Sequence, residues 1–348
     1  MRFIKYFISL LNKLVFYIQV TYRDSQFLID KLLGFKIIIF HISTPGQMQF
    51  ALPIYNEIIR RNIKFSVYLA LDYKMDDVIQ AFNLNQNKAF NVRLAPFLKN
   101  SDIYLQPEIW SRGPQQCIKI MYGHGQPKAH TNWSEENLKA FDIYFLYGPL
   151  NRDMFKCIQE KSPQATNHIK LFNIGYPKLD DLINRVTDRS EVLIKLGLNS
   201  SKKTIIYAPA WDPGCSLRTH GINIVSDLLT MDNINLIVKL HPVSLEPIES
   251  EHFNFYTGGI EWAKEFKVFE SEFSNFKFID DWSINDYLLV SDLMVTDFSG
   301  VAIEFMTLDR PVIYLDCPAF YNETLIDWGN DSKMAKDDDR FNSGRNYG

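Results

Sequence analysis

The sequence predicts an α/β protein with two doubly wound domains, each built on a parallel sheet with helices on both faces. Short runs rich in Ile, Val, Phe and Tyr alternate with segments that carry apolar residues at helical spacing. Most of these runs are apolar on both faces, which is typical of buried parallel strands. The length of 348 residues exceeds what one hydrophobic core usually organises, so we expect two domains.

The first series of strands indicates an N-terminal domain over residues 31–186. The run "FKIIIFHIS" (35–43) predicts a buried strand, and "GQMQFALPIYNEIIRRN" (46–62) predicts the amphipathic helix after it. Similar runs predict further strands at 64–71, 102–106, 118–125, 143–148 and 169–175.

A polar stretch then separates two series, and residues 187–203 are expected to form a linker. The second domain is expected over 204–326. Its predicted strands are 204–210, 235–242, 276–280, 293–300 and 311–315, with helical patterns at 221–231, 283–291 and 301–308. Because ligands of open α/β sheets bind beyond the carboxyl ends of the strands, we expect the site in a cleft between the domains.

The two ends of the chain differ in character. Residues 1–30 begin "MRFIKYFISLLNKLVFYIQV", in which a narrow stripe of polar and basic residues interrupts a wide apolar face. Such a helix can lie in a membrane interface, and packing on its own protein is the alternative that the pattern leaves open. No apolar run reaches the roughly 18 residues needed to span a bilayer. Residues 327–348 predict a solvated polar tail, including the acidic run at 337–339.

Composition excludes several classes of function. The formal net charge of -4 gives no basic excess for binding nucleic acid. The four cysteines lie far apart and form neither a Cys-x-x-Cys pair nor a Cys/His cluster, so we expect reduced thiols in a cytosolic protein and no zinc site.

A histidine follows one buried strand of the first domain. In "MYGHGQPK", His124 stands between Gly123 and Gly125, which allow a sharp turn and leave the imidazole accessible. Such a histidine can take a proton from a hydroxyl near neutral pH, and Lys128 could meet a phosphate. A loop histidine that only caps a carbonyl is the alternative.

Two strand ends of the second domain carry further candidates. In "IVKLHP", Lys239 and His241 are two residues apart and are expected on one face of the strand, where a cation and an imidazole suit a phosphate. In "YAPAWD", Pro209 and Trp211 could shape a base or ribose pocket, although Trp211 could equally belong to the core.

A third strand end lies in "VTDFSGVAIEF" (295–305), where a strand gives way to a helix. The positive end of a helix favours phosphate. Ser299 is expected to cap the helix and to present its hydroxyl, and Gly300 would let a ligand approach the backbone. Glu304, one turn further on, is expected within reach of a sugar hydroxyl, and Asp297 is expected to brace the turn.

Five motifs together resemble, in order and spacing, the CDP-glycerol glycerophosphotransferases, which are teichoic-acid primases and polymerases. These motifs are "HGQPK", "GYPKLD", "YAPAWD", "VKLHP" and "INDYLLVSDLMVTDFSGVAIEF". The resemblance covers about residues 118–316. It implies a GT-B fold, that is, two Rossmann-like domains with an interdomain cleft, the donor held mainly by the C-terminal domain and the acceptor facing the N-terminal one. It also implies that His124 and His241 match two family histidines, and that Thr296 and Ser299 lie in the segment that contacts the donor phosphates.

The function that this resemblance implies is transfer of glycerol or ribitol phosphate from a CDP-linked donor, with release of CMP. The acceptor would be a hydroxyl of a lipid-linked or polymeric glycan in teichoic acid or capsule synthesis, at the inner face of the cell membrane. His124 would act as base, and His241 with Lys239 would stabilise the phosphates, without a metal or cofactor. Family members usually carry serine where this chain has Gly300. The alternatives are a GT-B glycosyltransferase that uses a CMP- or UDP-sugar, and an inactive polymer-binding scaffold.

Overall fold

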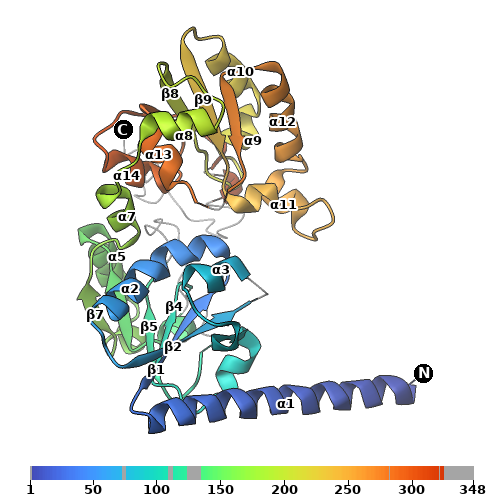
Figure 1. Cartoon of the computed structure of the whole chain (residues 1–348), viewed down its shortest axis with the longest axis vertical. Helices are drawn as coiled ribbons and strands as arrows, with labels where there is room; N and C mark the ends of the chain where they lie inside the picture. The colour runs from blue at the N-terminus through green and yellow to red at the C-terminus, as the bar shows by residue number, and fades with distance from the viewer. Residues whose placement is uncertain are drawn as a thin grey trace. The chain divides into compact units, whose positions relative to one another are not determined.

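The protein is described here by a computed structural model over residues 2–72, 76–108, 113–123, 135–281, 283–320 and 322–324. The chain forms two compact units, and within the described residues the first ends at Lys178 and the second begins at Leu179. Each unit contains its own parallel sheet (Figure 1). The predicted α/β class with two parallel sheets is therefore confirmed.

The first unit contains a seven-stranded sheet with the order β3-β2-β1-β4-β5-β6-β7. All neighbouring strands are parallel, and β1 pairs with β2 from Lys36↔Phe65 to Ile42↔Leu71. The chain places β2 and β3 on one side of β1, and it then places β4 and the later strands on the other side of β1. The strand order therefore reverses between β1 and β4. The strands are β1 (Lys36–Ile42), β2 (Phe65–Leu71), β3 (Ala89–Asn91), β4 (Ile103–Gln106), β5 (Ile118–Met121), β6 (Ile143–Leu146) and β7 (Lys170–Asn173).

Helices connect these strands and bury apolar faces against the sheet. In α2, five apolar side chains recur at helical spacing and are buried: Met48, Phe50, Ala51, Tyr55 and Ile58. The helices of this part are α1 (Arg2–Leu32), α2 (Met48–Arg60), α3 (Asp76–Ala81), α4 (Glu135–Leu138), α5 (Pro149–Lys161) and α6 (Pro163–Thr166), with 3₁₀ turns η1 (Pro45–Gln47), η2 (Gln86–Lys88) and η3 (Val92–Phe97). Helix α7 (Lys178–Asn184) follows at the boundary between the units.

The long helix α1 packs on the first unit from Phe16 towards its C-terminal end. Phe27 is fully buried in the core formed with β1 and β2. Arg23 is 6% exposed and donates hydrogen bonds to the carbonyls of Asn87 and Ala89, the latter at 2.8 Å. Its guanidinium also lies 5.1 Å from the ring centroid of Phe90. In Figure 1 the N-terminal turns of α1 extend past the rest of this unit.

Asp30 forms a second anchor between α1 and the sheet. Its Oδ2 accepts hydrogen bonds from the Tyr68 hydroxyl and from Lys88 Nζ, both at 2.8 Å, and from the Ser66 hydroxyl. Burial by itself would raise the pKa of Asp30, but the hydrogen bonds from Lys88, Ser66 and Tyr68 lower the pKa below its ordinary value.

The N-terminal turns of α1, by contrast, expose a series of apolar side chains. Leu10 and Leu14 are 56% and 57% exposed, and Tyr6, Phe7, Leu11 and Ile18 are exposed as well. The N-terminal turns thus expose their apolar side chains, and the C-terminal turns pack on the protein on one side while Ile29 and Leu32 remain exposed. Among the described residues, no helix is both long and apolar enough to cross a membrane.

The second unit contains a five-stranded parallel sheet with the order β10-β9-β8-β11-β12. Alternate residues of β8 enter two different cores, Ile205 and Tyr207 one and Ile206 the other, so both faces of the sheet are covered. The strands are β8 (Lys203–Tyr207), β9 (Ile234–Lys239), β10 (Phe276–Ile279), β11 (Leu293–Thr296) and β12 (Val312–Tyr314). The helices are α8 (Arg189–Lys195), α9 (Ser216–His220), α10 (Asn223–Leu229), α11 (Phe253–Thr257), α12 (Trp262–Glu272), α13 (Asn285–Val290) and α14 (Val301–Met306), with the 3₁₀ turn η4 (Pro242–Leu245).

The polar stretch 187–203 is attached to the second unit. It contains α8, and Arg189 at the start of this helix donates to Asp292 Oδ2 at 3.0 Å and to the Ser200 carbonyl at 2.7 Å. The predicted tail 327–348 lies outside the described residues.

Candidate functional site

Three loops of the second unit meet at one edge of its sheet. Because β8 lies between β9 and β11, the loops that follow these strands are neighbours. The strand order reverses between β8 and β11, and such a switch point is where open α/β sheets bind ligands. These loops begin at residues 208, 240 and 297, and the motifs "YAPAWD", "VKLHP" and "VTDFSG" run from the last residues of the strands into them.

Asp297 joins two of these loops. Its side chain is 1% exposed, and Oδ1 accepts a hydrogen bond from the Ala210 amide at 2.7 Å. Oδ2 accepts from the Ser216 amide at 2.8 Å and from the Ser216 hydroxyl at 2.7 Å. The Ser216 hydroxyl also lies 2.9 Å from the Tyr207 hydroxyl. Asp297 was predicted to brace its own turn after β11, and the segment that these bonds hold is the neighbouring loop after β8.

Thr296 strengthens the same connection. It is fully buried, and its hydroxyl donates to the Ala208 carbonyl at 2.6 Å. Pro209 is buried next to this bond, whereas Trp211 is half-buried. The loop after β8 is thus held at several points on either side of Trp211, which fixes the backbone that carries this residue.

Lys239 and His241 differ sharply in their surroundings. Lys239 is the last residue of β9, is 4% exposed, and donates from Nζ to the Leu240 carbonyl at 2.9 Å. His241 is exposed and stands at the cap of η4. The prediction that both share one face of a strand is wrong, because the strand ends at Lys239 and its alternation stops there.

The imidazole of His241 has a defined orientation. Its Nδ1 accepts a hydrogen bond from the Val243 amide at 3.3 Å, so a neutral ring carries its proton on Nε2. The ring centroid lies 6.0 Å from that of Trp211. In this tautomer the second nitrogen of His241 is a hydrogen-bond donor.

Tyr256 of α11 adds an aromatic side chain that the sequence motifs did not reveal. Its ring centroid is 5.4 Å from that of Trp211, in an edge-to-face arrangement. Tyr256 is half-buried, and its ring centroid lies 5.9 Å from that of His252. In the sequence, only the aromatic residues within 253–256 could have indicated this contact. Their pattern does not differ from that of an ordinary helix that packs on a core. Together with Trp211, this group offers flat surfaces suited to a planar ring.

The turn before α14 departs from the expected cap. Gly300 occupies the cap position, so the prediction that Ser299 caps this helix is wrong. The Ser299 carbonyl accepts from the Ala302 amide at 3.2 Å. A Cβ at Gly300 would meet no atom within 4 Å, and the φ of -62° suits any residue. Glu304 is 4% exposed, so α14 buries the carboxylate that was expected to reach a sugar hydroxyl.

The first-domain candidates His124, Gly125 and Lys128 lie outside the described residues. The described chain reaches Gly123, whose φ is +71° and where an added Cβ would lie 2.9 Å from the Tyr147 hydroxyl. The turn after β5 therefore requires glycine at this position. In the described part of the chain, no group of three or more His, Cys, Asp or Glu side chains is arranged to hold a metal ion.

Comparison with known families agrees with the motifs. Residues 151–321 match the model of the family described as CDP-Glycerol:Poly(glycerophosphate) glycerophosphotransferase, which confirms the resemblance over this segment. A teichoic acid poly(glycerol phosphate) polymerase of Bacillus spizizenii is 31% identical over 161 residues, which cover 43% of this chain and 36% of that protein. A polymerase of the same name from Staphylococcus epidermidis is 25% identical over 251 residues, which cover 68% of this chain and 32% of that protein. The chain thus spans about a third of the length of these curated relatives.

Solved structures support the fold. The wall teichoic acid polymerase TagF superposes with a TM-score of 0.56 at 16% identity, and the match covers 92% of this chain and 81% of that chain. A putative UDP-N-acetylglucosamine 2-epimerase from Listeria monocytogenes superposes with a TM-score of 0.52 at 14% identity over 85% of this chain and 82% of that chain. At these identities the likeness concerns the fold, and it agrees with the predicted GT-B class.

Proposed function

We propose that this chain, whose residues 151–321 belong to the CDP-glycerol glycerophosphotransferase family, transfers a polyol phosphate from a CDP-linked donor to a hydroxyl of a lipid-linked or polymeric glycan acceptor. One observation carries the proposal: three family motifs follow β8, β9 and β11, which are neighbouring strands at the switch point of the second sheet. The names of the curated relatives, teichoic acid poly(glycerol phosphate) polymerases, agree with a glycerol phosphate donor.

In the proposed reaction, the acceptor hydroxyl attacks the phosphorus that carries the polyol. A new oxygen–phosphorus bond forms, the bond to the bridging oxygen breaks, and its electron pair leaves with CMP. His124 is proposed to take the hydroxyl proton, on the basis of its motif alone. Charge then accumulates on the departing phosphate, and hydrogen-bond donors held in advance at that position would stabilise it.

His241 is the donor best suited to this task. Because Nδ1 accepts from the Val243 amide, the neutral ring presents an N–H from Nε2 without taking up a proton. The side chain is exposed and therefore accessible to a ligand. The buried ammonium of Lys239, two residues earlier, adds positive charge near the same strand end. Trp211 and Tyr256 offer the planar surface on which a pyrimidine base can stack.

Nucleotide release tests this function directly. The full chain is incubated with an acceptor and, separately, with CDP-glycerol, CDP-ribitol and UDP-N-acetylglucosamine, and the released nucleotide is identified. We expect CMP from a CDP-polyol and a loss of about 10² to 10³ in turnover for His241→Ala. His220→Ala, which changes another exposed histidine of this unit, is the matched control. Release of UDP would favour the glycosyltransferase, and release of no nucleotide would favour the scaffold.

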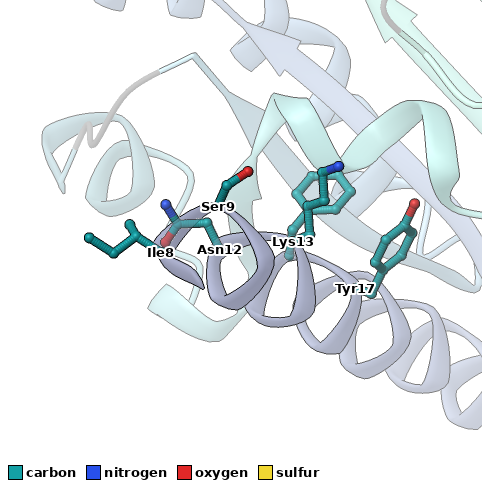
Figure 2. Close-up of a pocket in the computed structure, with 6 residues that line it drawn as sticks. Ile8, Ser9, Asn12, Lys13 and Tyr17 are labelled. Atoms are coloured by element: carbon teal, nitrogen blue, oxygen red, sulfur yellow. The ribbon is translucent and has the colours of Figure 1, made fainter. Parts of the chain in front are cut away.

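We also propose that the N-terminal turns of α1 bind the cytoplasmic face of the membrane. Figure 2 shows Ser9, Asn12 and Lys13 on one side of the helix, where with Tyr17 they line a shallow pocket. Leu10 and Leu14 contribute exposed apolar surface to the same turns. A lysine beside exposed apolar side chains suits an interface with anionic headgroups.

Flotation with phosphatidylglycerol vesicles tests the membrane proposal. The double substitution Leu10→Glu and Leu14→Glu affects exposed side chains, so we expect folding to be retained and vesicle binding to be lost. Ile194→Glu is the matched control, because Ile194 is an apolar residue of α8 that is 66% exposed. Equal flotation of the double variant and the unmodified protein would refute the proposal.

A further inference from the structure

Trp211 and Tyr256, which we name the aromatic pair, are carried by two different segments of the second unit. Tyr256 belongs to α11, which has five residues and is followed by Gly258 and Gly259, both with positive φ. A helix of one turn is not stable by itself, and two glycines give the link to α12 little stiffness. The position of Tyr256 therefore depends on side chains that anchor α11 from neighbouring segments.

Two side chains hold the carboxyl end of α11. Trp262, at the start of α12, donates from Nε1 to the Thr257 carbonyl at 2.9 Å. Arg218, in α9, donates from its guanidinium to the Phe255 carbonyl. A Cβ at Gly258 would lie 3.8 Å from Arg218 Cδ, so the arginine side chain lies along this end of the helix. The last carbonyls of a helix have no partner within the helix, and a cation there also meets the negative end of the helix dipole.

The helix that carries Arg218 is fixed to the loop that carries Trp211. Helix α9 begins at Ser216, whose amide and hydroxyl both donate to Oδ2 of Asp297. The other oxygen of Asp297 accepts from the Ala210 amide, next to Trp211. One buried carboxylate therefore holds both the backbone beside Trp211 and the start of the helix from which Arg218 extends.

The charge of Arg218 also interacts with the residue after Trp211. Burial lowers the pKa of the guanidinium below its ordinary value, and electrostatic interactions with Cys215, Glu323 and Asp212 raise it. An arginine remains charged near neutral pH in spite of such a shift. The guanidinium thus contacts both segments of the aromatic pair, electrostatically at Asp212 and by its hydrogen bond to α11.

We infer that Arg218 is a positioning residue that sets Tyr256 against Trp211 and thereby shapes the surface on which the pyrimidine ring of a nucleotide stacks. The two ring centroids are 5.4 Å apart in an edge-to-face arrangement, so a displacement of α11 changes the surface that the pair presents. Arg218 acts through Tyr256 and is assigned no contact with the reacting atoms. The identification of the ring as a pyrimidine rests on the proposed function.

Nucleoside binding tests this role separately from phosphate binding. Cytidine, uridine and CMP are each titrated into the full chain, and binding is measured by saturation-transfer NMR. We expect Arg218→Met to weaken the binding of all three about threefold to tenfold, because part of the stacking free energy is lost. Arg218→Lys keeps a donor for the Phe255 carbonyl and should weaken binding less.

Arg310→Met is the matched control, because Arg310 also binds carbonyls at the end of a helix. It donates to the Leu288 and Ser291 carbonyls at the end of α13, at 3.0 and 2.5 Å. These residues precede β11 and β12 and lie at the amino edge of the second sheet, whereas Trp211 follows β8 at the carboxyl edge. We expect both substitutions to lower the melting temperature, and only Arg218→Met to weaken nucleoside binding.

A double-mutant cycle shows whether the effect passes through Tyr256. In a Tyr256→Ala background, Arg218→Met should leave the cytidine affinity nearly unchanged, because the side chain that Arg218 positions is gone. In turnover assays, Arg218→Met should raise the KM for CDP-glycerol and leave kcat nearly unchanged, since a weaker base contact affects the ground state and the transition state alike.

The outcomes separate this inference from the proposed function. Nucleoside affinity that Arg218→Met leaves unchanged, or lowers equally with and without Tyr256, would overturn the inference even if CMP is released from CDP-glycerol. Weaker binding of CMP alone would also overturn it, because that result indicates a phosphate contact, as would the absence of nucleoside binding by the unmodified chain. A loss of nucleoside affinity that requires Tyr256 would support it even if no CDP-polyol is turned over. Thermal melting verifies folding, and Arg218→Lys provides the binding measurements if Arg218→Met does not fold.

Discussion

The brace formed by Asp297 gives the sharpest test of how the second unit is held together. Asp297→Ala removes the acceptor of three hydrogen bonds, from the Ala210 amide, the Ser216 amide and the Ser216 hydroxyl. The residue is 1% exposed, so solvent reaches these donors poorly after the substitution. The predicted result is a strong destabilisation of the second unit.

The magnitude follows from these contacts. Hydrogen bonds to a charged group contribute about 1.5 to 3 kcal/mol each, so three of them set an upper bound of about 9 kcal/mol. Two effects reduce this value: the substitution also removes the desolvation cost of a buried carboxylate, and the Ser216 hydroxyl keeps the Tyr207 hydroxyl at 2.9 Å. We therefore expect a loss of about 3 to 5 kcal/mol in the free energy of unfolding. Asp297→Asn, which keeps one oxygen acceptor, should cost about 1 to 3 kcal/mol.

Hydrogen exchange is the appropriate assay, because a chain with two units need not unfold in one step. Exchange is followed by mass spectrometry in peptides that cover residues 203–216 and, for comparison, the strands of the first unit. Asp227→Ala, at an exposed position of α10, is the control and should change stability by less than about 0.5 kcal/mol. If Asp297→Ala left the exchange of the Ala210 and Ser216 amides unchanged, or cost less than about 1 kcal/mol, the bracing role would be refuted.

Three further predictions concern α1 and the glycines. The pKa of Asp30 is lower in the folded protein than in the unfolded chain. Its stabilising contribution is therefore present above the unfolded pKa of about 3.9 and is lost as pH falls through the folded value. In parallel melting curves, Asp30→Asn should lose more thermal stability at pH 7 than at pH 3. Arg23→Ala removes buried contacts of α1 with the Asn87 and Ala89 carbonyls and should speed hydrogen exchange in residues 16–32, whereas Arg60→Ala, at an exposed position, should not. Gly214→Ala should lower the free energy of unfolding in urea by about 2 to 4 kcal/mol, because φ is +75° and the new Cβ would lie 2.5 Å from the Phe320 amide nitrogen. The control Gly300→Ala should leave this free energy nearly unchanged.

Most strands could be predicted from the sequence to within a few residues. The runs at 35–43 and 64–71 correspond to β1 (Lys36–Ile42) and β2 (Phe65–Leu71). The strand predicted over 118–125 extends too far at its carboxyl end, since β5 ends at Met121. Apolar residues such as Tyr122 continue past the last ladder hydrogen bond and are buried all the same, so hydrophobicity does not reveal where pairing stops. Strand β3 was not predicted because three residues contain too little periodicity.

The candidate site was predictable in composition but not in geometry. The motifs identified the loops after β8, β9 and β11. A bracing role of Asp297 was predicted for its own turn, whereas its hydrogen bonds hold the loop after β8. The sequence did not predict that Lys239 is buried while His241 is exposed. Side chains alternate between the two faces only within a strand, and β9 ends at Lys239. The cap at Gly300 and the aromatic contact of Tyr256 with Trp211 also required the positions of neighbouring segments.

The sequence by itself determined the α/β class, the presence of two series of parallel strands and the resemblance to the family whose model matches residues 151–321, because periodicity and motif spacing are properties of short segments. Only the tertiary structure decided which loops are neighbours. Asp297 and Ala210 are 87 residues apart, yet they share a hydrogen bond because β11 pairs with β8. Likewise, Gln47 and Glu108 meet across 61 residues because β4 lies beside β1. Strand order is set by how the whole sheet buries its two faces, and no single segment contains that information.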